Sequence, residues 1–106
     1  MATGNTIRIK AKAKSDTVEV KSLISHPMET GLRKDSSTNE LIPAHFIQEL
    51  TAELNGKIVM TAYWGIAISK NPYVSFEIKG GKKGDTVRLT WTDNKGESDS
   101  LAVKVH

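Results

Sequence analysis

The feature that most constrains the fold is an alternation of apolar and polar residues that recurs along much of the 106-residue chain. In the first run, Ile7–Lys14, every second residue is apolar and the others are arginine or lysine. Successive side chains of a strand point to opposite faces of a sheet, so this period of two predicts half-buried strands. About seven such segments, separated by turns, predict an all-β fold: an immunoglobulin-like antiparallel β-sandwich, with residues 1–106 as a single domain. The apolar residues expected to point inward are Ile7, Ile9, Val18, Val20, Leu50, Leu54, Phe76, Leu89, Trp91, Val103 and Val105.

Residues 43–54 fit two periodicities. Their apolar residues have helical spacing, yet alternate residues from Phe46 to Leu54 would also share one face of a strand. The pair Asn55-Gly56 follows directly and is typical of a two-residue hairpin turn. We therefore expect a strand here, with residues 57–62 as its partner.

Two other segments lack a clear alternation. Residues 28–40 are a polar loop, and a loop of this length is either functional or mobile, or a solvated crossover between two sheets. Residues 63–69 are more apolar and aromatic than their neighbours, which fits either a partner-binding patch or a buried strand. Gly65 within them indicates a bulge or a close approach of two backbones.

Composition excludes several functions. The chain has no cysteine, so disulfides, thiolate catalysis and cysteine-ligated metals are impossible. The net charge of +3 is small, and its cations are spread along the sequence with few aromatic residues, which argues against nucleic-acid binding. No apolar run is long enough to span a membrane, and Met1–Thr6 lack the apolar segment of a secretion signal. The sequence alone predicts a cytoplasmic protein, or one exported by a route not encoded in this chain.

The cations of the first run have two interpretations. Arg8, Lys10, Lys12 and Lys14 could bind an anionic partner, or their strand could lie at a sheet edge where lysines discourage pairing with other sheets. We favour the second interpretation.

The histidines do not form a recognisable site. His26, His45 and His106 lack the spacing of a metal site, and the nucleophile-elbow motif of hydrolases does not occur. Because Pro27 favours an extended residue before it, His26 is expected to close a strand or lie at the surface. We expect no catalytic residue, no metal ligand and no cofactor. A hydrolase whose site is assembled only in space stays open as an alternative, which a buried histidine–carboxylate pair in a cleft would favour.

Several short motifs occur in an order that is specific as a set. They are Leu-Ile-Ser-His-Pro-Met-Glu-Thr-Gly-Leu-Arg at residues 23–33, Leu-Ile-Pro at 41–43, Asn-Gly at 55–56, Asn-Pro-Tyr at 71–73, Gly-Asp at 84–85 and Leu-Thr-Trp-Thr-Asp at 89–93. With this set the chain resembles the SoxZ family from about Ile7 to the last strand. The resemblance implies an immunoglobulin-like sandwich that takes part in bacterial sulfur oxidation.

The resemblance also implies a partner. In that family SoxZ pairs with SoxY, whose C-terminal Gly-Gly-Cys-Gly-Gly segment carries sulfur intermediates on its cysteine, and the loaded SoxY segment visits other Sox enzymes. A chain without cysteine cannot be the sulfur-bearing subunit, and its association with SoxY must be non-covalent. The resemblance implies export to the periplasm as a passenger bound to SoxY. The alternative function is an immunoglobulin-like binding or adhesion module with an unrelated partner.

We expect the SoxY-like partner to bind an apolar surface rather than a charged one, because the net charge is small and exposed charges are screened at physiological salt. The candidate contact residues are Met28, Leu32, Tyr63, Trp64 and Ile66. Met28 and Leu32 are expected to be exposed, so that aspartate at either position would weaken the complex without unfolding the domain.

Overall fold

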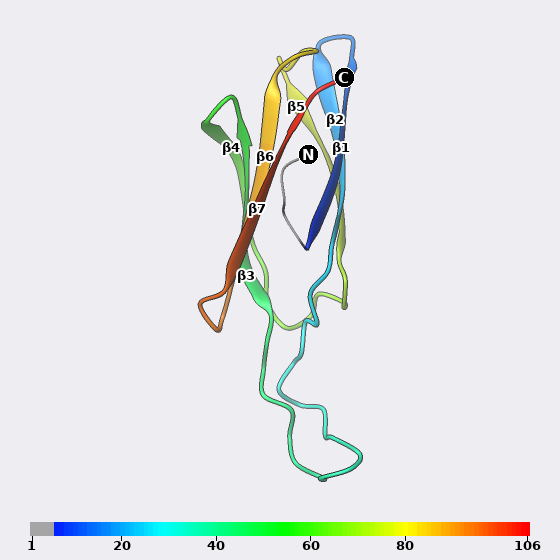
Figure 1. Ribbon diagram of the computed structural model, residues 1–106, viewed down its shortest axis with the longest axis vertical. Coiled ribbons are helices and arrows are strands. Elements are labelled where there is room, and N and C mark those ends of the chain that lie inside the picture. Colours follow the sequence, from blue (N-terminus) through cyan, green and yellow to red (C-terminus); the bar gives the residue numbers. More distant parts are fainter. Residues whose placement is uncertain (1–5) are drawn as a thin grey trace.

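Residues 6–106 are described by a computed structural model, and they form seven strands and no helix (Figure 1). The strands are β1 (Ile7–Lys14), β2 (Thr17–Ile24), β3 (Ile47–Leu54), β4 (Lys57–Tyr63), β5 (Tyr73–Lys79), β6 (Thr86–Asp93) and β7 (Ser98–Lys104). No helix in this part of the chain could therefore cross a membrane. The expectation about a secretion signal concerns Met1–Thr6, which lie outside the described residues except for Thr6.

The strands form two antiparallel sheets packed face to face, which confirms the predicted β-sandwich. One sheet has the order β1-β2-β5 and the other the order β4-β3-β6-β7. This order is compatible with an immunoglobulin-like arrangement. Every residue predicted to point inward is buried or half-buried. The half-buried ones pack against the core and are Ile9, Leu54, Phe76 and Val103. The core also includes residues outside this prediction, such as Ile24, Ile47 and Leu101.

Strand β3 is the ambiguous segment, and it begins at Ile47 rather than at residue 43. The strand prediction is confirmed, and Asn55 and Gly56 form the turn to β4 with φ angles of 52° and 86°. The register with β6 shifts between Ile47 and Glu49, which turns both Ile47 and Leu50 inward. This irregularity explains the helical spacing of the apolar residues. Because of the shift, Gln48 is exposed and does not share the inward face of Leu50 and Ala52, as a regular strand from Phe46 to Leu54 would require.

Residues 64–72 form an irregular connection rather than a continued strand, because β4 ends at Tyr63. The alternative of a buried strand is therefore wrong. Gly65 has no neighbouring atom within 4 Å of the position of a Cβ, so the predicted close approach at this residue is also wrong. Trp64 and Ile68 are half-buried against the core, and Ile66 is exposed.

Residues 29–45, which we call the arm, project from one end of the sandwich as two extended segments side by side (Figure 1). Glu29 and His45 exchange backbone hydrogen bonds of 2.7 and 3.0 Å, and Ile42 N–H donates to the Arg33 carbonyl at 2.8 Å. A Cβ on Gly31 would come within 3.2 Å of the Ala44 Cβ, and Gly31 has a φ of 85°. Glycine therefore suits both the conformation and the close approach of the two segments. The arm accounts for much of the elongated shape, 53 × 24 × 19 Å.

Candidate functional site

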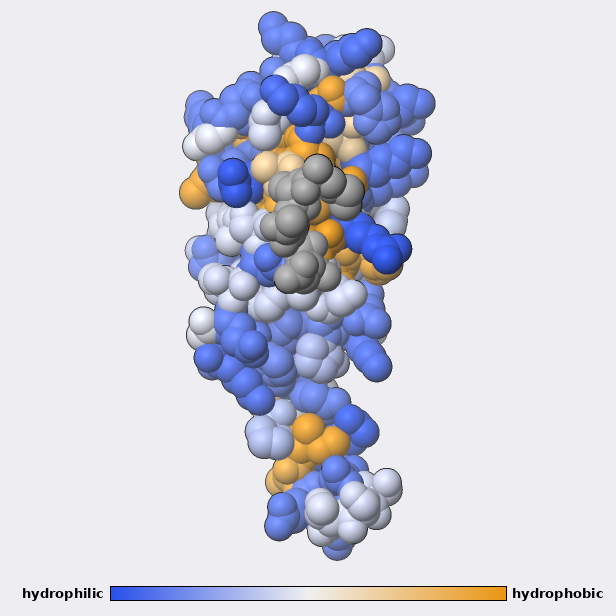
Figure 2. Space-filling model, in the orientation of Figure 1, coloured by the Kyte–Doolittle hydropathy of each residue, from blue (hydrophilic) through white to orange (hydrophobic). Residues whose placement is uncertain are grey.

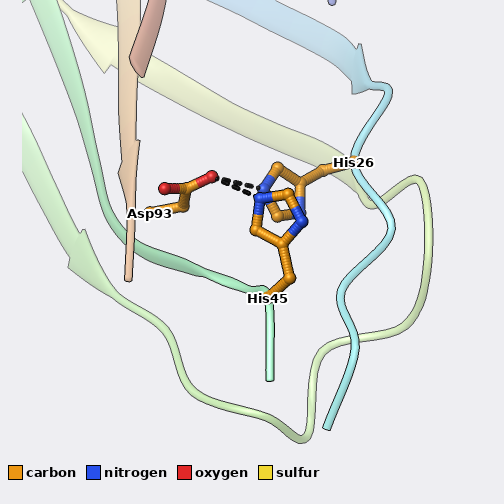
Figure 3. Close-up of side chains that lie close together, drawn as sticks. All are labelled: His26, His45 and Asp93. Atoms are coloured by element: carbon orange, nitrogen blue, oxygen red, sulfur yellow. Dashed lines mark hydrogen bonds and ion pairs between the residues drawn. The ribbon is translucent and has the colours of Figure 1, made fainter. Parts of the chain in front are cut away.

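The base of the arm holds a cluster of two histidines and one aspartate from distant parts of the sequence (Figure 3). His26 follows β2, His45 precedes β3, and Asp93 is the last residue of β6. The Asp93 Oδ2 atom lies 3.0 Å from Nε2 of His26 and 2.8 Å from Nε2 of His45. The two imidazole rings meet edge to face with centroids 4.5 Å apart. The cluster joins the arm to both sheets.

Both oxygens of the Asp93 carboxylate are fully engaged. Oδ2 accepts from the two histidines, and Oδ1 accepts from the backbone N–H groups of Lys95 and Glu97 at 3.0 and 2.9 Å. Burial alone would raise the pKa of Asp93, but hydrogen bonds from His26, Glu97, His45 and Lys95 outweigh it and lower the pKa below its ordinary value. Asp93 is therefore a stable buried anion.

His26 is buried, so the prediction that it closes a strand or lies at the surface is wrong; β2 ends at Ile24. Its Nδ1 accepts a hydrogen bond from the Met28 N–H at 3.2 Å. A neutral imidazole that accepts at one nitrogen carries its proton on the other, so Nε2–H donates to Asp93. The Trp91 ring packs edge to face against His26 at 5.0 Å. These contacts fix both the orientation and the tautomer of the ring.

His45 forms the outer side of the cluster. Its Nε2 lies 3.0 Å from Oε1 of Glu97 in addition to its contact with Asp93, and its side chain is partly exposed. An N–H group between two carboxylate oxygens can donate to both of them, so His45 bridges the buried Asp93 and the exposed Glu97.

The three side chains could in principle surround a metal ion, because one ligand atom from each lies within 4.8 Å of the others. Two histidines and a carboxylate are ligands that zinc and iron accept. However, a metal on His26 Nε2 would require the proton on Nδ1, where it would face the Met28 N–H. The hydrogen bonds are therefore those of a network in which His26 Nε2 carries a proton rather than a metal ion. That the chain takes no metal stays a prediction.

The cluster is also poorly placed for hydrolysis. The side chains of His26 and Asp93 are 2% and 0% exposed, so this pair does not open into a cleft. Among residues 6–106, no serine or threonine hydroxyl is hydrogen-bonded to either histidine. The pair thus lacks the nucleophile that a triad needs. Holding the arm in place is the role that the contacts support.

The candidate partner contacts fall into two groups. The first group is Leu32, which is 76% exposed on the arm. The second group lies where β4 ends: Tyr63 is the last residue of β4 and is 79% exposed, and the loop after it contains Trp64 and Ile66. Residues 64–72 flank the base of the arm, since Lys70 lines a hollow together with Pro27, Thr30 and Arg33. The structure thus places both groups at the same end of the molecule.

Met28 does not fit the expectation. It is buried in the core, its φ is 50°, and its sulfur accepts a 3.4 Å hydrogen bond from the Ile47 N–H. The prediction that Met28 is an exposed loop residue is wrong, because Met28 fills the junction between arm and sandwich. Leu41, 58% exposed on the arm, is an apolar residue that the sequence analysis did not select. Figure 2 shows an apolar area on the arm among hydrophilic surroundings. We call Leu32 and Leu41 the arm leucines.

The fold and site define a small β-sandwich that holds a projecting arm by a buried histidine–aspartate network. Comparison with protein families gives the particular family: the model for the sulphur oxidation protein SoxZ matches residues 7–104. The chain therefore belongs to the SoxZ family, and its role lies in sulfur oxidation. No curated protein gave a significant match.

Proposed function

We propose that this chain is the non-catalytic subunit of a SoxYZ carrier. Its partner is a SoxY-like protein whose C-terminal cysteine segment holds sulfur intermediates during thiosulfate or sulfide oxidation. The observation that carries this proposal is the arm, which extends from a SoxZ-family sandwich and exposes Leu32 and Leu41. Membership of the family supports the sulfur-oxidation role, and the lack of cysteine in this sequence supports a carrier in which the partner holds the sulfur.

The arm has the properties of a docking element. Two extended segments with few cross-strand hydrogen bonds are marginally stable in water by themselves. Packing the arm leucines against a partner would remove apolar surface from water, at about 25 cal/mol per Å². Tyr63 and Ile66 lie at the same end of the molecule and would extend the contact toward the size of a stable interface, roughly 1,600 Å² in total.

The carrier role also suits the chemistry of the chain. A protein without thiols cannot exchange with a sulfur-loaded cysteine, so it supports the carrier without competing for its cargo. The proposed location is the periplasm, reached as a passenger with SoxY. Fractionation of cells with and without SoxY tests this: the chain should leave the cytoplasm only when SoxY is made.

The interface is tested by co-purification with the SoxY-like partner. Leu32→Asp and Leu41→Asp should abolish the complex at both low and high salt, because each buries a charge in an apolar contact. Ser36→Asp adds the same charge to the exposed end of the arm and should leave the complex intact. Binding by both leucine variants at parental affinity would refute the arm interface. Capture of a stable partner without a Gly-Gly-Cys-Gly-Gly terminus would favour the alternative of an unrelated binding module.

A further inference from the structure

The outer face of the β1-β2-β5 sheet collects positive charge that the sequence scatters. The strand register places residues from the three strands in four rows, each on the solvent side. From the arm end upward the rows are Arg8-Leu23-Tyr73, Lys10-Lys21-Ser75, Lys12-Glu19-Glu77 and Lys14-Thr17-Lys79. This surface, which we call the basic face, therefore carries six cations against two carboxylates, a net of four positive charges.

The basic face accounts for the charge of the whole protein. The net charge of the chain is +3, so the residues outside this face have no net positive charge. The other sheet presents a different outer face, with rows such as Thr51-Thr90-Ser100 and Glu53-Arg88-Ala102. The cations are therefore spread along the sequence but gather on one face of the folded molecule.

The cations of the basic face are incompletely neutralised. Glu19 pairs with Lys14 at 3.1 Å and with Lys21 at 3.6 Å. Among residues 6–106, Arg8, Lys10, Lys12 and Lys79 lie within 4 Å of no carboxylate oxygen. Lys10 and Lys21 are directly opposite in register, an arrangement that destabilises a sheet. This pair lies next to exposed Leu23 and Tyr73, so positive charge and apolar surface adjoin on this face.

The structure places β1 at an edge of its sheet, as the sequence analysis favoured, but edge protection explains only part of this arrangement. The backbone of β1 is already paired on its outer side near its end, where His106 exchanges hydrogen bonds of 2.9 and 3.1 Å with Ala13 and Ala11. Moreover, Lys21 belongs to β2, the central strand of the sheet, where no edge needs protection.

We propose that the basic face is a second docking surface, which binds acidic surfaces of the proteins that the carrier visits. This inference rests on the proposed carrier function and deepens it. A carrier that serves several enzymes needs contacts that form fast and dissociate fast, and complementary charge raises association rates without requiring high affinity. The arm contact with SoxY, by contrast, is apolar and permanent.

The residues of the basic face favour a protein as its ligand over a polyphosphate such as a nucleic acid. Glu19 and Glu77 lie side by side within the basic face, where they would repel a continuous phosphate backbone. Tyr73 is the single aromatic residue of the face, so successive bases have no series of rings on which to stack. A protein partner can place its carboxylates opposite Lys10, Lys21 and Lys12 and leave the two glutamates uncovered.

The experiment uses the full chain and an oligoglutamate peptide as probe, followed by NMR shifts and titration calorimetry. Binding should be detectable at about 0.01 M salt and fall steeply by about 0.15 M, as the screening length shrinks from about 30 to about 8 Å. The shifted amides should belong to β1, β2 and β5. Lys10→Glu combined with Lys21→Glu should weaken binding by about tenfold or more.

The matched control is Arg88→Glu combined with Lys104→Glu, the same charge change on the outer face of the other sheet, which should bind the peptide nearly as well as the parent. Equal losses in the two double variants would overturn the proposal, because net charge alone would then explain binding. Tighter retention of a short DNA duplex or of phosphatidylglycerol vesicles at about 0.15 M salt would assign the face to that ligand instead. Both double variants should still co-purify with SoxY, which separates failure of this proposal from failure of the arm interface.

Discussion

Asp93 is the residue on which the contacts at the base of the arm converge. Its two oxygens accept four hydrogen bonds, two from imidazoles and two from its own hairpin turn. In a buried site each donor loses its water when the chain folds, so each needs this acceptor. Asp93 thereby links β2, β3 and β6 at the point where the arm leaves the sandwich.

Asp93→Asn should destabilise the fold by about 3 kcal/mol near neutral pH, because a neutral amide cannot satisfy both histidines and both backbone donors. The pKa of Asp93 is lowered in the folded state, so its carboxylate stabilises the fold above its unfolded pKa of about 3.9 and loses this effect as the pH falls through the folded value. The difference between parent and variant should therefore shrink below about pH 4. Urea unfolding across pH measures it, with Asp16→Asn as the exposed control; a difference that persists in acid would contradict this assignment.

The tautomer of His26 leads to a prediction about metals. Because Nδ1 accepts from the Met28 N–H and Nε2–H donates to Asp93, zinc would have to displace a proton and break an amide contact. Tag-free protein treated with chelator should contain no zinc by elemental analysis, and added zinc should leave its unfolding midpoint unchanged. Stoichiometric zinc that is lost in His26→Asn would show that the cluster is a metal site after all.

At the scale of elements, the arm and the sandwich differ in what holds them together. Residues of β3 and β6 pair along their length and bury Ile47, Leu50 and Leu89 between the sheets. The arm has isolated bridges at Glu29–His45 and Lys34–Leu41 and exposes both arm leucines. Local opening needs little free energy where few buried contacts are lost, so the two parts should differ in dynamics.

Hydrogen exchange tests this difference. Arm amides such as Ile42 should exchange at least about a hundredfold faster than the amides of Val20 and Leu89 in the isolated chain. Addition of the SoxY-like partner should slow the arm amides selectively. Arm protection equal to that of the core without any partner would mean that the arm is stable by itself, and no slowing with SoxY would place the interface elsewhere.

At the scale of the whole molecule, three surfaces differ in chemical character. The arm end presents apolar residues, the β1-β2-β5 sheet presents cations, and the outer face of the other sheet is threonine-rich and close to neutral. The sandwich core lies between the sheets and does not depend on residues 30–44. Folding and partner binding should therefore be separable.

Replacing residues 30–44 by Asn-Gly tests that separation. Glu29 and His45 exchange both backbone hydrogen bonds, so a two-residue turn can join them directly while Met28 and the histidine cluster stay in place. The shortened chain should fold with a stability within about 1 kcal/mol of the parent and fail to bind SoxY. Denaturant unfolding and co-purification measure the two effects. Retained SoxY binding, or loss of the fold, would contradict the division between arm and sandwich.

Local sequence determined the elements of this protein. The alternation in Ile7–Lys14 and the turn at Asn55-Gly56 depend on neighbouring residues, because strand faces and hairpin turns are set by short-range geometry. The set of motifs, including residues 23–33 and 89–93, was sufficient to identify the SoxZ family, which the family comparison confirms. Leu32 was correctly expected to lie exposed, whereas Met28 was not. For Tyr63 and Ile66 the sequence left a surface patch and a buried strand open, and the structure shows both residues exposed. The contacts of these residues with a partner stay predictions.

Tertiary structure decided what depends on residues far apart in the chain. His26, His45 and Asp93 come from three segments, so no spacing in the sequence could show that they meet. The same reason hid the burial of Met28, whose partner is Ile47, and the basic face, whose rows combine three strands. The inward turn of Ile47 depends on the register with β6, which is set by cross-strand pairing and not by the order of residues within one strand.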